Sequence, residues 1–177
     1  MAYRNGTYVA FDGQGTTNPT ESDIRYYNTL KMWSANSDID FKFSDSHKKT
    51  YQVRDSSQTA TLKRRLLERL CDSKNMLLIV TSKTSWDRGL LNFEIEKAVE
   101  TYSLPIIVTY PECSSVTNPS TLRSKWPEAL EREIDSNKAR CIHIPFTKDS
   151  IFECIRRFSV HSTGNDVLTS PVHYSMR

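Results

Sequence analysis

The sequence lacks the features that would place the protein in a membrane, in a secreted disulfide-bonded class or around a metal. No apolar run approaches the length of a bilayer-spanning helix, and the first residues, MAYRNGTYVAFD, carry no signal-peptide pattern. The four cysteines show no CxxC spacing, and the four histidines are equally dispersed. We therefore expect a cytoplasmic protein with free thiols, no membrane contact and no metal site.

The sequence is also short of clustered positive charge and of glycine-rich phosphate motifs. Its net charge is only +3 over 177 residues, and the basic residues at 63–69 fit an ordinary charged helix face. The GQG at 13–15 lacks the third glycine of a dinucleotide fingerprint, and no Walker motif is present. We therefore expect no nucleic-acid partner, while 37% hydrophobic and 25% charged residues are typical of a globular domain.

What the sequence does contain is a regular alternation of short apolar runs with amphipathic segments, the pattern of buried strands and covering helices. The predicted strands are residues 7–11, 41–43, 76–81, 105–110 and 141–144. With right-handed crossovers, this alternation predicts a flavodoxin-like α/β fold: a five-stranded parallel sheet in the order 2-1-3-4-5, with helices on both faces. We expect a single domain over residues 1–160, followed by a polar C-terminal tail at 161–177.

Residues 76–100 are the stretch around which the chain is organised, because a buried strand, a polar loop and an amphipathic helix follow one another there. The apolar side of the predicted helix carries Leu90, Leu91, Phe93, Ile95 and Ala98. Ligands of open α/β sheets bind outside the carboxyl ends of the strands, so the loop 82–88 and the first turns of this helix are the expected site. Glu94 lies near the buried edge of the helix, but glutamate is usually solvated, and composition alone favours that interpretation.

Five segments of the sequence resemble one known family. They are YVAFDG, FKFSDSHKK, LLIVTSKT, FEIEKAVE and LPIIVTY, which together span about residues 7–110. These segments resemble the bacterial TIR-like domains of Thoeris anti-phage defence proteins. The resemblance implies a flavodoxin-like fold, and, because many bacterial TIR domains cleave NAD+, it implies an NAD+ glycohydrolase or cyclase.

The resemblance also implies a site. In that family the catalytic glutamate lies on the helix after the third strand, and the matching position is Glu94. The loop after the first strand matches at Phe11 and Asp12, and the loop after the third strand matches at Ser82 and Thr84. These four residues are expected to contact the substrate.

Three more residues are candidates for substrate contact. Asp45 and His47 end the second predicted strand, where they either touch the substrate or simply order a solvated loop. Trp86 either stacks on a base or covers the sheet edge. Better-known TIR domains often place Trp-Cys shortly before the glutamate, and this sequence departs from them with Leu91-Asn92 near that place.

The chemistry that the resemblance implies needs few groups. The nicotinamide–ribose bond of NAD+ already carries the positive charge, so nicotinamide departs neutral and no general acid is required. One carboxylate can stabilise the oxocarbenium-like transition state. NAD+ is then a substrate and no cofactor is needed. Water as acceptor gives ADP-ribose, and an adenine nitrogen gives a cyclic isomer. The resemblance further implies a homo-oligomer, a phage-derived trigger and a separate downstream effector.

Two other classes of function stay open. One is a non-catalytic TIR-like interaction or self-assembly module in which Glu94 is structural. The other is a flavodoxin-like protein that binds a nucleotide or flavin through GTTNPT at 15–20, whose hydroxyls and amides could cradle a phosphate. Nucleoside deoxyribosyltransferases share the fold class and the N-glycosidic chemistry, and are a further neighbour.

Overall fold

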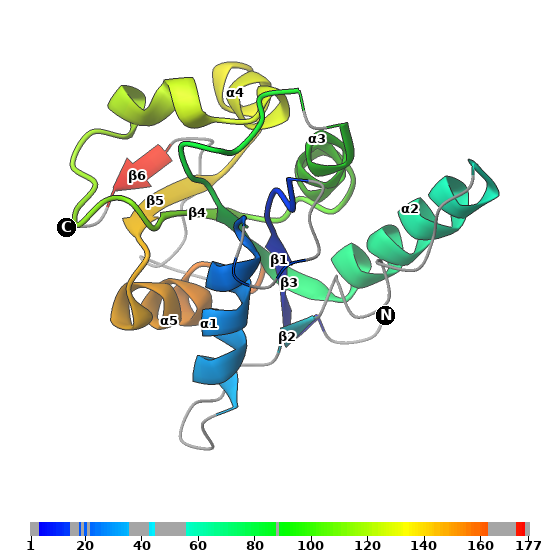
Figure 1. The fold of residues 1–177 in the computed structure, drawn as a ribbon, viewed down its shortest axis with the longest axis horizontal. Coiled ribbons are helices and arrows are strands. Elements are labelled where there is room, and N and C mark those ends of the chain that lie inside the picture. The colour runs from blue at the N-terminus through cyan, green and yellow to red at the C-terminus, as the bar shows by residue number, and fades with distance from the viewer. Residues whose placement is uncertain are drawn as a thin grey trace.

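Six strands form a sheet in which every neighbouring pair runs parallel, in the order β2-β1-β3-β4-β5-β6 (Figure 1). The computed structural model describes residues 4–14, 18, 20, 22–35, 43–44, 56–87, 89–162 and 173–175. Four strands of five to seven residues form the body of the sheet: β1 (Gly6–Ala10), β3 (Ser73–Ile79), β4 (Ile106–Tyr110) and β5 (Cys141–Pro145). Two short strands, β2 (Phe43–Ser44) and β6 (His173–Ser175), form the edges.

Helices cover both faces of the sheet, as buried parallel strands require. On one side lie α1 (Ile24–Ser34) and α5 (Lys148–Arg157), which Figure 1 shows next to each other. On the other side lie α2 (Ser56–Cys71), α3 (Gly89–Glu96) and α4 (Glu128–Asp135). A π-helical turn, η2 (Lys97–Thr101), extends α3, and a 3-10 helix, η3 (Pro119–Lys125), precedes α4.

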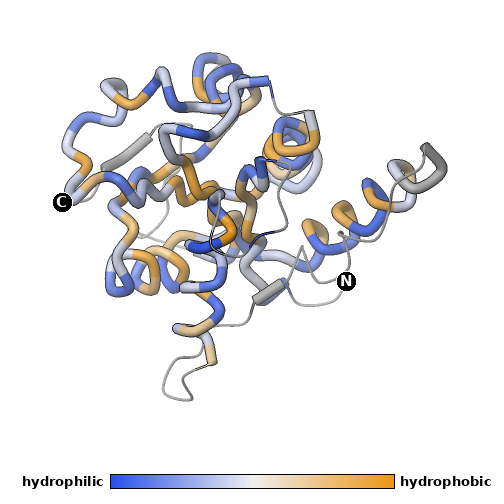
Figure 2. Tube along the Cα trace, in the orientation of Figure 1, coloured by the Kyte–Doolittle hydropathy of each residue, from blue (hydrophilic) through white to orange (hydrophobic). Residues whose placement is uncertain are grey.

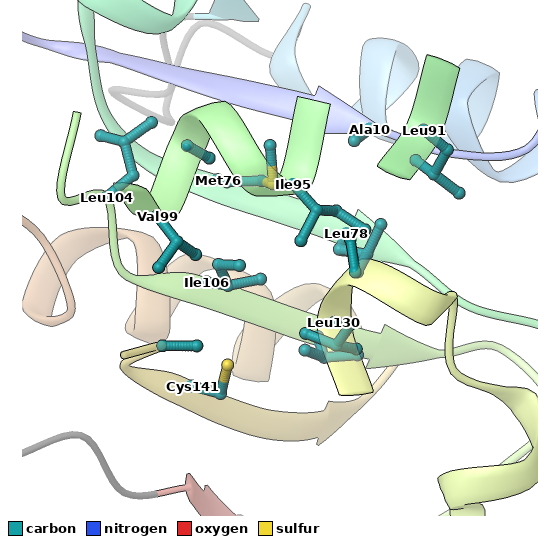
Figure 3. Packing of buried hydrophobic residues seen from close by; sticks show 14 of the residues in the cluster. Ala10, Met76, Leu78, Leu91, Ile95, Val99, Leu104, Ile106, Leu130 and Cys141 are labelled. Carbon is teal, nitrogen blue, oxygen red and sulfur yellow. The ribbon is translucent and has the colours of Figure 1, made fainter. Parts of the chain in front are cut away.

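The strands send alternate side chains to two separate cores, because successive residues of a strand point to opposite faces. Met76, Leu78 and Ile106 belong to the core beneath α2, α3 and α4, where Figure 3 shows them against Ile95 and Leu130. The residues between them in the strands pack beneath α1 and α5: Leu77, Ile79 and Ile107. Figure 2 accordingly shows hydrophobic stretches along the central strands.

The predicted α/β fold with a parallel sheet and covering helices is confirmed. The predicted number of five strands is wrong, since the body of the sheet has four and the two short edges bring the total to six. Strand β6 comes from the segment predicted as a polar tail, and it pairs with β5. An edge strand of three residues needs no apolar run, so it leaves no sequence signal. Among the described helices, none is both long and apolar enough to cross a bilayer.

Candidate functional site

Glu94 is a buried residue, contrary to the solvated alternative. It lies on α3, whose other buried residues are Leu91 and Ile95. Only 4% of the Glu94 residue is exposed. Its neighbours include Tyr8 from β1 and Arg69 from α2. The residue therefore faces the sheet on the side that α2 and α3 cover.

Burial controls the charge of Glu94. Desolvation raises the pKa of this carboxyl group to about 8, although the nearby Tyr8 side chain and the positive charge of Arg69 act in the opposite direction. Within the described ranges, no cation forms an ion pair with Glu94. At neutral pH the free protein thus holds Glu94 mainly as the neutral acid.

Asp12 ties two loops together at the carboxyl end of the sheet. Its Oδ1 accepts a hydrogen bond of 2.8 Å from the amide of Gln14, and its Oδ2 accepts one of 2.9 Å from the amide of Ser85. The residue is buried. Asp12 therefore fixes the loop after β1 against the loop after β3.

Phe11 lies on the opposite side of the sheet from the neighbours of Glu94. It belongs to the core beneath α1, where its ring centroid is 5.2 Å from that of Tyr27. Tyr8, by contrast, belongs to the core beneath α3. Tyr8 therefore lies near Glu94, whereas Phe11 lies on the opposite face of the sheet, beneath α1.

Ser82 and Thr84 both organise the loop after β3. Ser82 donates its amide and its hydroxyl hydrogen to the Glu112 carboxylate, with a hydroxyl distance of 2.6 Å. The Thr84 hydroxyl accepts a 2.9 Å hydrogen bond from the amide of Thr81 and reaches Asp23 Oδ2 at 3.5 Å. These hydrogen bonds stabilise one conformation of the loop after β3.

Trp86 is an exposed candidate, with 54% of the residue accessible to solvent. Its indole Nε1 donates to Glu131 at 3.3 Å, and its carbonyl oxygen accepts hydrogen bonds from the Glu128 amide at 2.8 Å and the Asn92 side chain at 3.1 Å. The loop is thereby anchored to the start of α4. The other two candidates, Asp45 and His47, lie outside the described residues.

Asp23 is a buried acid that was not among the predicted site residues. It occupies the N-cap position of α1, and its Oδ1 accepts a 2.9 Å hydrogen bond from the Thr81 hydroxyl. Desolvation, together with the negative charge of Asp12, raises the pKa of Asp23 to about 6 against the effect of the threonine hydrogen bonds. An aspartate just before a helix is a frequent N-cap, but its contact with a residue 58 positions away has no local signal.

No group of three histidine, cysteine, aspartate or glutamate side chains in the described part of the chain is placed to hold a metal ion. The described candidate residues therefore comprise three buried carboxyl groups, Asp12, Asp23 and Glu94, and a set of hydrogen-bonded loops at the carboxyl ends of β1 and β3.

Comparison with known families confirms the resemblance seen in the sequence. The family model for the TIR-like domain of the Thoeris protein ThsB matches residues 8–116, which is more than half of the chain. The match includes most of β1 and all of β3, α3 and β4, and with them Glu94 and the loops described above. Thoeris proteins act in anti-phage defence, and this places the chain in that context. The chain therefore belongs to the family of TIR-like domains of the Thoeris protein ThsB.

Proposed function

We propose that this chain cleaves the bond between nicotinamide and ribose in NAD+, with Glu94 as the catalytic carboxylate. The observation that carries the proposal is the burial of Glu94 without an ion pair in the described part of the chain. Burying a carboxyl group in an apolar core costs folding free energy, and such groups cluster at functional sites. The sequence resemblance further implies that Glu94 matches the catalytic glutamate of the family, which supports the proposal.

The proposed reaction breaks the bond between C1′ of the ribose and the pyridinium nitrogen. The bonding electron pair passes to that nitrogen, so nicotinamide leaves neutral and C1′ becomes the centre of an oxocarbenium-like cation. A carboxylate in surroundings of low polarity opposes this developing charge more strongly than one in water. Glu94 supplies such a carboxylate on the side of the sheet where Tyr8 and Arg69 also lie.

The charge state of Glu94 couples substrate binding to catalysis. In the free protein its raised pKa, about 8, keeps most molecules neutral at pH 7. A cationic pyridinium ring nearby favours the ionised form and lowers that pKa. The proton therefore leaves as NAD+ binds, and the carboxylate forms where the positive charge is about to move onto the ribose.

The loops after β1 and β3 position the residues of this proposed site. The described contacts of Asp12, Ser82 and Thr84 include hydrogen bonds within the protein, so we assign them a positioning role. The largely exposed ring of Trp86 is available to stack on a base. Phe11 supports the first loop from the α1 side.

The acceptor decides the product. If the oxygen of water attacks C1′ and loses a proton, the product is ADP-ribose, and if an adenine nitrogen attacks, the product is a cyclic isomer. We propose that this product is the signal to a separate effector in anti-phage defence. We further propose that the chain acts as a homo-oligomer in the cytoplasm and that a phage-derived trigger starts turnover.

The test is nicotinamide release from NAD+ by purified protein, with and without extract of phage-infected cells. Glu94→Gln keeps the size and removes the charge, and it should lower turnover by at least about 100-fold, the effect of losing one preorganised electrostatic contact. The matched control is Glu96→Gln on the same helix, where Glu96 pairs with Lys97 and Arg132 at the surface. This control should turn over NAD+ like the wild type.

Full activity of Glu94→Gln would remove Glu94 from the mechanism. If the wild type releases no nicotinamide with any extract, including extract of infected cells, the non-catalytic interaction module would instead be favoured.

A further inference from the structure

A hollow of about 400 Å³ lies between the start of α1 and the loops that follow β1, β3 and β4. We call it the α1 hollow. Its lining includes Gln14, Asp23, Arg25, Thr81, Lys83 and Glu112. Glu94 does not line it, so the α1 hollow is separate from the proposed catalytic carboxylate.

The negative charge of Glu112 is already compensated by the protein. Its carboxylate accepts hydrogen bonds from the amide and hydroxyl of Ser82 and, at 2.9 Å, from the Lys125 ammonium. Although desolvation opposes ionisation, these contacts outweigh it and lower the pKa of Glu112 to about 2. The Glu112 carboxylate is thus held in place in the lining of the α1 hollow by contacts within the protein.

The other acid, Asp23, is largely turned toward the protein. It is buried, and its two oxygens face the hydroxyls of Thr81, at 2.9 Å, and Thr84, at 3.5 Å. Its repulsion of an anion in the hollow is therefore weakened by two hydroxyl dipoles. Binding of an anion would be opposed less here than beside a solvated, unpaired aspartate.

The two cations of the lining are held less tightly than Glu112, although the positive charge of Arg25 acts to lower the pKa of Asp23. Arg25 and Lys83 are both exposed, and within the described ranges neither forms an ion pair. The Arg25 guanidinium donates to the Tyr26 hydroxyl at 2.7 Å and lies 4.6 Å from the centre of that ring. This contact uses one of its five N–H donors and leaves others for a ligand.

Gln14 adds a neutral donor. Its side-chain nitrogen is buried, and it has no hydrogen-bond acceptor within the described part of the chain. Buried amide donors in folded proteins are nearly always paired. An acceptor oxygen in the α1 hollow would supply the missing partner.

We propose that the α1 hollow binds the phosphate group of a small phosphate monoester. Arg25 and Lys83 contact the phosphate oxygens through charge-assisted hydrogen bonds, and Gln14 donates from its side-chain nitrogen. Two cations and one unpaired donor suit an acceptor with two negative charges better than they suit a neutral sugar or a cation. The proposal does not depend on NAD+ turnover.

The test is an NMR titration of the ¹⁵N-labelled chain at pH 7.5 with inorganic phosphate, adenosine monophosphate and adenosine. Phosphate and the monophosphate should give saturable shifts at the amides of Gln14 and Lys83, while adenosine gives none. Lys83→Gln should weaken binding about tenfold or more, the effect of one hydrogen bond between charged groups. Lys31→Gln, an exposed lysine near the other end of α1, is the matched control and should bind like the wild type.

The arms of the titration also separate the sources of the phosphate. A much tighter complex with the monophosphate identifies a nucleotide ligand, and equal affinity identifies free phosphate. The proposal fails if neither probe gives saturable shifts, or if Lys83→Gln and Arg25→Gln both bind like the wild type. It also fails if Glu94→Gln abolishes binding, because the ligand would then occupy the Glu94 site.

Discussion

The indole Nε1 of Trp126 donates a hydrogen bond of 2.8 Å to the hydroxyl oxygen of Tyr110, deep beneath α4. The same hydroxyl is 2.8 Å from Nδ1 of His143 on β5. All three residues are buried, and the His143 ring stacks on both aromatic rings. One hydroxyl group therefore joins β4, β5 and the residue just before α4.

Tyr110→Phe should lower the free energy of unfolding by about 1–3 kcal/mol, because the Trp126 N–H and His143 Nδ1 each lose a buried partner while the ring volume is kept. Denaturant unfolding followed by tryptophan fluorescence measures the change. Tyr102→Phe, at a partly exposed tyrosine, is the control and should cost less than about 0.5 kcal/mol. Equal stability of Tyr110→Phe and the wild type would show that the hydroxyl contributes nothing.

Glu94→Gln should stabilise the protein at alkaline pH. The pKa of Glu94 rises from 4.5, the ordinary value, to about 8 on folding, so folding favours the neutral form. The stability linked to that form is fully present below pH 4.5 and is lost as the pH rises through about 8. Glutamine stays neutral, so the difference in unfolding free energy between variant and wild type should grow by more than about 2 kcal/mol from pH 5 to pH 9. A constant difference would mean that Glu94 is not shifted.

The rate of NAD+ cleavage should rise with pH if Glu94 acts as a carboxylate. In the free enzyme, kcat/KM should increase through an apparent pKa of about 8 and then level off. The profile of kcat should be displaced to lower pH, because the cationic substrate favours ionisation in the complex. A rate that falls over this range would indicate that the neutral acid is the active form.

Asp12→Asn should loosen the loops after β1 and β3. The two carboxylate oxygens accept from the amides of Gln14 and Ser85, and an asparagine offers one acceptor oxygen and turns its NH₂ group toward a backbone N–H. We expect a loss of about 1–3 kcal/mol in stability and faster hydrogen exchange in both loops. Ser85→Ala keeps the backbone amide and removes only the exposed hydroxyl bond to Asp87, so it should leave exchange in the loop after β1 unchanged.

Much of the fold could be predicted from local patterns. The continuous apolar runs that became β3 and β4 are typical of strands buried on both faces, and their alternation with amphipathic helices leads to a parallel sheet. The edge strand β6 was missed, because a three-residue HYS segment that pairs with β5 needs no apolar pattern.

Within the site, the sequence by itself determined that Glu94 lies on a helix that follows a buried strand. The spacing of apolar residues and the strand propensity are local properties of the chain. Only the tertiary structure decided that Glu94 is buried, because its environment comes from Tyr8 and Arg69 on other elements. The same holds for Asp12 and Ser85, which are 73 residues apart in the chain. Desolvation and long-range hydrogen bonds depend on which elements pack together, and no local pattern of residues specifies that.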